Sequence, residues 1–90
     1  TPVNPGIPLS TQILIQNLAF NPDSLTVPAG TSVTWINNDA VTHTVTSDTG
    51  VFESKNLDPG GTFSFTFVTP GTYQYHCAIH PQMKGTVIVQ

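Results

Sequence analysis

The residues best suited to metal chemistry stand close together near the end of this 90-residue chain. Its single cysteine, Cys77, is followed three residues later by His80, and Met83 comes three residues after that. Pro81 stiffens this short segment, so a compact loop can point all three side chains at one enclosed atom. A thiolate, an imidazole and a thioether in one site together favour copper.

A copper site with this donor set needs a second nitrogen ligand, because two histidines and a cysteine with a weak axial methionine form the blue-copper arrangement. The chain has three histidines. His76 lies on the opposite face of an expected strand from Cys77, which leaves His43, at the start of a β-rich run that follows a turn. The predicted ligands of a single copper ion are therefore His43, Cys77, His80 and Met83.

Each of these residues also has a simpler interpretation. A lone cysteine is usually an inert core thiol, and methionine is a common filler of hydrophobic cores. His43 taken alone is more typical of a polar strand residue. Zinc is the competing metal, but structural zinc sites usually contain at least two cysteines, and methionine is a poor ligand for zinc. The combined spacing of Cys77, His80 and Met83 is what favours copper.

The elements that must position these ligands are predicted to be β-strands. Period-two alternation dominates the chain, and its clearest example is Thr62–Phe67, where three phenylalanines alternate with serine and threonine. On a strand these rings share one face, which a second layer must cover. The other β-rich runs are Gln12–Gln16, Leu25–Val27, Ser32–Ile36, His43–Ser47, Gly71–Cys77 and Gly85–Val89. Short strands punctuated by turn residues predict an all-β sandwich or barrel of about seven to eight strands.

The domain organisation is simple. Three prolines fall within the first eight residues, so residues 1–10 are predicted to form an extended arm or the remnant of a linker. Residues 11–90 are predicted to form one domain, because the chain is short and shows no internal repeat. Within it, Val51–Leu57 is compatible with a strand, a single helical turn or a loop.

Composition excludes several classes of function. Two lysines against five acidic residues give a formal charge of −3, so no basic patch for nucleic acid is expected. One cysteine forms no internal disulfide. No apolar run approaches the ~20 residues of a membrane helix, and no signal peptide is visible, although the proline-rich start is compatible with a lost anchor.

From Phe20 to Val89 the sequence resembles the cupredoxins of the plastocyanin and amicyanin group. The matching segments include Phe20-Asn-Pro22, Val33-Thr-Trp35, Asn37-Asn-Asp39, His43-Thr-Val45, Gly71-Thr-Tyr73, Tyr75-His-Cys77, His80-Pro81 and Met83. The spacing of the last three ligands resembles the short ligand loop of amicyanin, whereas plastocyanins have a longer gap before the methionine. The resemblance implies a Greek-key sandwich with copper under the loops at one end, and an exposed edge of His80 as the doorway for the electron.

The function that this resemblance implies is single-electron transfer by a type 1 copper ion that cycles between Cu(I) and Cu(II), without enzymatic activity. It also implies a location outside the cytoplasm, in a periplasm or at the outer face of a membrane. Transient redox protein partners are expected to dock around His80, where Ala78, Ile79, Pro81 and Gln82 form a small, weakly polar surface. We expect a monomer.

The chain departs from the family pattern on both sides of the first ligand. Thr42 stands where the family often has proline, and Thr44 stands where it often has an asparagine that ties the two ligand loops together. A threonine hydroxyl at position 44 can replace part of that hydrogen bonding. The departures therefore bear on the rigidity and the reduction potential of the site, and not on the four ligands.

Three other functions stay open. A copper enzyme that acts on a small molecule requires Met83 to leave one metal position free. A copper storage or delivery protein usually has several methionines, cysteines or exposed histidines. A metal-free immunoglobulin-like module explains the strands equally well, but it makes the spacing of Cys77, His80 and Met83 a coincidence.

Overall fold

The computed structural model describes residues 10–90, and every regular element within them is a β-strand. The strands are β1 (Ser10–Gln16), β2 (Ala19–Asn21), β3 (Ser24–Val27), β4 (Thr31–Asn37), β5 (Thr46–Ser47), β6 (Thr62–Phe67), β7 (Gly71–His76) and β8 (Lys84–Val89). They form two four-stranded sheets with the orders β2-β1-β4-β6 and β3-β8-β7-β5. The prediction of an all-β sandwich is confirmed.

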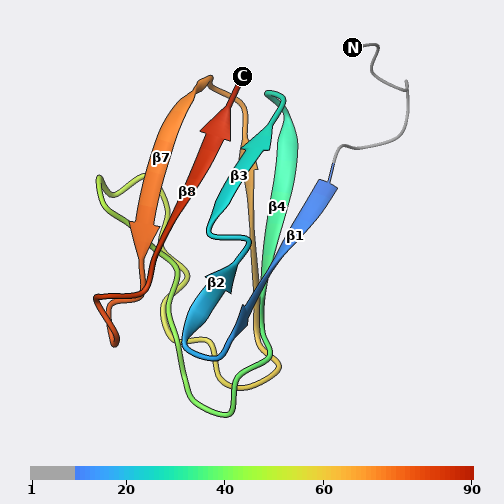
Figure 1. The fold of residues 1–90 in the computed structure, drawn as a ribbon. Coiled ribbons are helices and arrows are strands. Elements are labelled where there is room, and N and C mark those ends of the chain that lie inside the picture. Colours follow the sequence, from blue (N-terminus) through green and yellow to red (C-terminus); the bar gives the residue numbers. More distant parts are fainter. Residues whose placement is uncertain (1–9) are drawn as a thin grey trace.

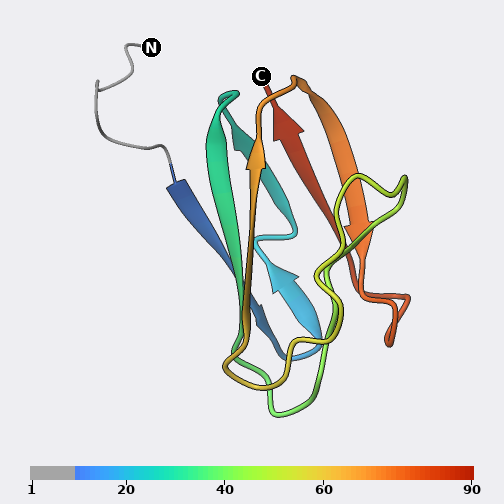
Figure 2. The same cartoon turned by 180° about the vertical axis from the view of Figure 1, so that it is seen from behind.

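Both sheets mix parallel and antiparallel pairs, since β1 runs parallel to β4 and β3 runs parallel to β8. The two sheets lie face to face as two layers (Figures 1 and 2). The β1–β2 turn, the β4–β5 connection and the β7–β8 loop gather at one end, which we call the ligand end. The β6–β7 turn lies at the opposite end, because β7 runs the length of its sheet toward the ligand end.

Alternate residues of the facing strands fill the space between the sheets. The largest fully buried hydrophobic side chains are Trp35, Tyr75, Phe20, Phe67, Ile13 and Ile15. The rings of Trp35 and Tyr75 meet edge to face across the two sheets, with their centroids 5.4 Å apart. The phenylalanine stripe of β6 faces this core as predicted, with Phe67 buried and Phe63 and Phe65 packed against it.

The strand predictions differ from the structure at two places. No strand is predicted between Gln16 and Leu25, but Ala19–Asn21 forms β2, antiparallel to β1. A strand of three residues is too short to show period-two alternation. The strand predicted at His43–Ser47 exists only at Thr46–Ser47, because the amide of Thr44 donates to Cys77 Sγ and does not join a ladder.

The segment Val51–Leu57 contains neither a helix nor a named strand. Glu53 and Leu57 form isolated β-bridges with Thr46 and His43. Of the arm predicted over residues 1–10, residues 1–9 lie outside the described residues, and Ser10 begins β1. Between residues 10 and 90 there is no helix with the length and hydropathy needed to cross a membrane.

Candidate metal centre

The loop between β7 and β8 is closed by its own backbone. Because β7 ends at His76, Cys77 is the first residue of the loop. The amide of Cys77 donates to the carbonyl oxygen of Met83 at 3.0 Å, and the amide of Met83 donates to that of His80 at 2.8 Å. These bonds bring the three predicted C-terminal ligands into one compact turn.

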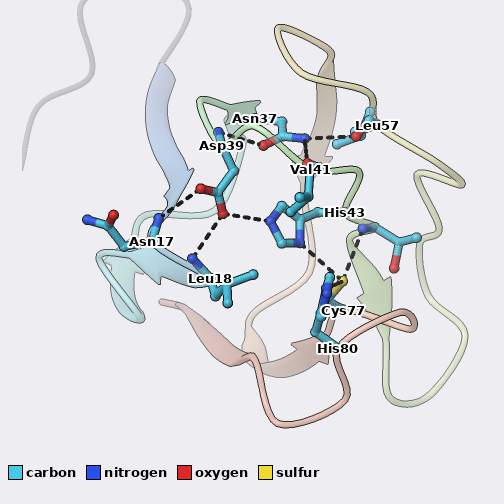
Figure 3. Close-up of polar contacts among 10 residues, drawn as sticks. Asn17, Leu18, Asn37, Asp39, Val41, His43, Leu57, Cys77 and His80 are labelled. Atoms are coloured by element: carbon cyan, nitrogen blue, oxygen red, sulfur yellow. Dashed lines mark hydrogen bonds and ion pairs between the residues drawn. The ribbon is translucent and has the colours of Figure 1, made fainter.

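Three of the four predicted ligands converge on one point at the ligand end. Cys77 Sγ lies 3.6 Å from Nδ1 of His43 and 3.8 Å from Nδ1 of His80. The three ligand atoms all lie within 4.8 Å of one another. Cys77 and His43 are fully buried, whereas His80 is half-buried. His43 comes from the β4–β5 connection and His80 from the β7–β8 loop, and Figure 3 shows the ring of His43 pointing at the sulfur of Cys77.

These separations fit a metal ion in trigonal coordination. Bonds of about 2.0–2.3 Å, usual between a first-row metal and imidazole nitrogen or thiolate sulfur, place two ligand atoms about 3.5–4.0 Å apart. The nitrogen-to-sulfur distances of 3.6 and 3.8 Å fall within that range. Two imidazoles and a thiolate are the trigonal donor set of type 1 copper, so the residues fit a bound copper ion.

The environment of Cys77 favours its thiolate. Burial alone raises the pKa of this thiol, but the hydrogen bond from the Thr44 amide and the nearby rings of His43 and His80 act in the opposite direction and lower it to about 6. The Thr44 amide donates to Sγ at 3.3 Å. Because the thiolate is the form that binds metals, the site is ready for a metal at neutral pH.

The ring of His43 is oriented by a carboxylate. Nε2 of His43 lies 2.8 Å from Oδ2 of Asp39, while Nδ1 faces the sulfur (Figure 3). An ionised carboxylate only accepts hydrogen bonds, so Nε2 carries the proton and Nδ1 presents its lone pair to the site. A partner of this kind fixes the tautomer of a metal-binding histidine and raises its basicity.

Asp39 is itself held by the backbone of the β1–β2 turn. Its carboxylate oxygens accept the amides of Asn17 at 3.1 Å and Leu18 at 2.9 Å, and both of these residues have φ of 56°. The Leu18 amide and then His43 hold the pKa of Asp39 below its usual range. Asn37, fully buried, adds a third tie by accepting the Asp39 amide at 2.9 Å. The orientation of His43 thus depends on two connections, β1–β2 and β4–β5, and on the last residue of β4.

The residue pattern places Asp39 only in the turn before His43 and does not predict this role. The available signal is its position four residues before a predicted ligand, which by itself places no atom. Thr44, by contrast, is expected to tie the ligand loops together, and it does so. Its hydroxyl oxygen accepts the amide of Ala78 at 2.7 Å. Thr42 donates to Asp58 Oδ1 at 3.0 Å.

The remaining predicted residues lie as follows. The side chain of Met83 is 3% exposed and belongs to the same closed loop as Cys77 and His80. His76 faces away from the site, as expected, and its Nδ1 lies 2.6 Å from Oδ1 of Asp48.

Comparison with known proteins places this geometry in a family context. The family model described as a cupredoxin-like domain matches residues 8–89. Amicyanin-alpha of Methylorubrum extorquens is 36% identical over 86 residues, which cover 90% of this chain and 72% of the relative. Plastocyanin of Scenedesmus fuscus is 38% identical over 86 residues, covering 81% of this chain and 88% of the relative.

Solved structures agree with the sequence comparison. The copper(I) form of an amicyanin variant is similar to this chain with a TM-score of 0.85 and 32% identity, over 90% of this chain and 82% of that one.

Proposed function

The chain belongs to the cupredoxin-like family, and from this premise we propose that it is a mononuclear type 1 copper protein that carries single electrons between redox partners. One observation carries the proposal: the buried Sγ of Cys77 has the Nδ1 atoms of His43 and His80 at 3.6 and 3.8 Å. A copper ion held there supplies a Cu(I)/Cu(II) couple that accepts or gives one electron. The protein is accordingly a carrier and not an enzyme.

The proposed ligands are His43, Cys77, His80 and Met83. Cys77 supplies the thiolate, the two histidines supply neutral imidazole nitrogens, and Met83 supplies a weak axial thioether. The burial of Met83 at 3% exposure and its backbone bond to Cys77 support its inclusion. A methionine in that place closes the site to water and anions, which separates a carrier from an enzyme with an open metal position.

The protein's own part in electron transfer is to keep the ligands in place in both oxidation states. Asp39 orients His43, the Thr44 amide holds the sulfur of Cys77, and the loop backbone joins Cys77 to Met83. Groups that are held in this way need little rearrangement when the charge of the site changes.

We also propose that transient redox partners dock around His80. Its neighbours Ala78, Ile79, Pro81 and Gln82 are all exposed, and none of them carries a charge. This favours a redox protein with a similarly uncharged, weakly polar contact face. Family membership supports a monomer, which sedimentation of the purified protein will check. It also supports a location outside the cytoplasm, which fractionation of producing cells will check.

The first test is titration of the purified protein with Cu²⁺, followed by visible absorption and EPR spectra, for the wild type and Met83→Ala. We expect stoichiometric binding, an intense thiolate-to-copper absorption and a narrow copper hyperfine splitting. Met83→Ala should keep that absorption but shift the reduction potential, because the axial ligand tunes the potential. Cys77→Ser, which removes the thiolate, should lose the absorption.

The other outcomes separate the rival functions. Ordinary tetragonal copper spectra in the wild type, or spectra that change when small anions are added, would show an open site and favour the copper enzyme. Absence of tight binding would favour the metal-free module. Ready transfer of copper to a weak chelator would favour storage or delivery.

A further inference from the structure

A chain of hydrogen bonds leads from the ligand loop to the surface. The amide of Ala78, the residue after Cys77, donates to Oγ1 of Thr44 at 2.7 Å. Oγ1 of Thr44 lies 2.9 Å from Oγ1 of Thr46, which donates to Oε2 of Glu53 at 3.1 Å. Thr44 is buried, Thr46 is half-buried and Glu53 is exposed, so the chain runs from the interior to solvent.

The direction of each bond follows from counting protons. A threonine hydroxyl has one proton, and a carboxylate has none to give. Because Thr46 donates its one hydroxyl proton in the hydrogen bond to Glu53, its oxygen can only accept a hydrogen bond from the hydroxyl of Thr44. The oxygen of Thr44 in turn accepts the hydrogen bond that the Ala78 amide donates. All three donors therefore point the same way, from the ligand loop toward Glu53.

The outer end of the chain is fixed as well. Oε2 of Glu53 also accepts the amide of Lys55 at 2.8 Å, and Lys55 has a left-handed φ of 62°. Glu53 and Thr46 are further joined by a β-bridge between their backbones. A surface carboxylate with two donors on one oxygen and a paired backbone is anchored rather than free to turn into solvent.

We propose that Thr44, Thr46 and Glu53 form a relay of positioning residues that holds the amide next to Cys77 and lowers the reduction potential of the site. The inference rests on the proposed copper function. Aligned hydrogen bonds polarise one another, so the negative charge of Glu53 strengthens the donation from Ala78. Each hydroxyl turns its oxygen toward the ligand loop, which makes the electrostatic potential at the metal site more negative. A more negative potential stabilises the oxidised state, which carries more positive charge, and so lowers the reduction potential.

The relay must be separated from the simple effect of a nearby surface charge. An exposed carboxylate acts weakly through water because the solvent screens it. The relay instead acts through Thr46, so the effect of Glu53 must depend on that hydroxyl. Thr46→Val removes the hydroxyl, keeps the shape of the side chain and leaves the charge of Glu53 in place.

One arm of the test needs no metal. Amide hydrogen exchange of Ala78 is measured by NMR in the metal-free protein for the wild type, Thr44→Val and Thr44→Ser. Loss of one hydrogen bond should speed exchange about tenfold in Thr44→Val, and Thr44→Ser should restore wild-type protection. Thr34→Val is the matched control, because it removes a hydroxyl paired with Ser64 at 2.7 Å on the outer face of the other sheet.

The second arm measures the reduction potential of the copper-loaded protein. Thr46→Val and Glu53→Gln should each make the potential more positive, and Glu53→Gln should add nothing further in a Thr46→Val background. Thr34→Val should leave the potential unchanged.

Two results would overturn the relay. One is a shift in the reduction potential by Glu53→Gln that is just as large in the Thr46→Val background. The other is an unchanged rate of Ala78 amide hydrogen exchange in Thr44→Val. A wild type without the thiolate-to-copper absorption would instead contradict the proposed function. The exchange measurement then decides by itself whether Thr44 holds the Ala78 amide.

Discussion

At the scale of single residues, Asp39 connects His43, a fully buried proposed ligand, to the rest of the fold. Its carboxylate accepts His43 Nε2–H at 2.8 Å and the amides of Asn17 and Leu18 at 3.1 and 2.9 Å. These bonds, first that of the Leu18 amide, lower the pKa of the Asp39 carboxyl below its usual range. The orientation of His43 therefore depends on one side chain that is not itself a ligand.

We predict that Asp39→Asn lowers the affinity for Cu²⁺ by about 10- to 100-fold, the usual cost of losing a partner that orients a metal ligand. The measurement is a competition titration against a chelator of known affinity, with circular dichroism to verify the fold. Asp23→Asn is the control, because it removes the same charge from the β2–β3 connection and should leave the affinity unchanged. Equal losses in both variants would mean that net charge, and not orientation, is responsible.

At the scale of the elements, the pairing of β7 with β8 depends on a glycine. Gly85 lies opposite Tyr75 in the register of the two strands. A Cβ atom at position 85 would overlap the ring of Tyr75. That ring is 1% exposed and packs against Trp35 and Phe20, so it has little room to move. The same strand pair carries the ligand loop between its ends.

Gly85→Ala is therefore expected to lower the free energy of unfolding by about 1–3 kcal/mol, the usual range for overpacking a core. Urea denaturation of the metal-free protein measures this change. In a Tyr75→Leu background the same substitution should cost less, because the ring that it meets is gone. A penalty of the same size in both backgrounds would assign the loss to the backbone of β8 instead.

At the scale of the whole molecule, each end of the sandwich exposes an apolar side chain, but the two differ in what lies beside it. The ligand end carries His80 beside Ile79, which is 47% exposed, whereas the opposite end carries Val68 at 69% exposure in the β6–β7 turn. Both are apolar and both lie in loops, but only Ile79 adjoins a proposed ligand. If partners dock around His80, the rate of electron exchange should respond to substitutions at the ligand end and not to substitutions at the opposite end.

Self-exchange between oxidised and reduced copies of the protein, measured by NMR line broadening, tests this without a known partner. Ile79→Lys should slow the exchange by about tenfold, the effect of disrupting an important contact at a small interface. Val68→Lys changes the net charge by the same amount and should leave the rate unchanged. Similar rates in the two variants would contradict docking around His80.

Much of the fold is predictable from local patterns. The period-two stripe of Thr62–Phe67 predicts both a strand and its buried face, and the alternation before Cys77 places His76 on the outside. Local patterns fail at Ala19–Asn21, where a three-residue strand depends on its pairing with β1. They fail again at His43–Val45, where the sulfur of Cys77 and the hydroxyl of Ser54 take amides that a strand needs.

By itself, the sequence determined the type of site, because the donors at Cys77, His80 and Met83 lie within one short loop and copper chemistry follows from donor type and spacing. Only the tertiary structure decided how the rest of the site is built. His43 meets Cys77 across 34 positions of the chain, and Asp39 reaches Asn17 across 22. Contacts between residues that far apart arise from the packing of the two sheets, which brings three connections to the same end.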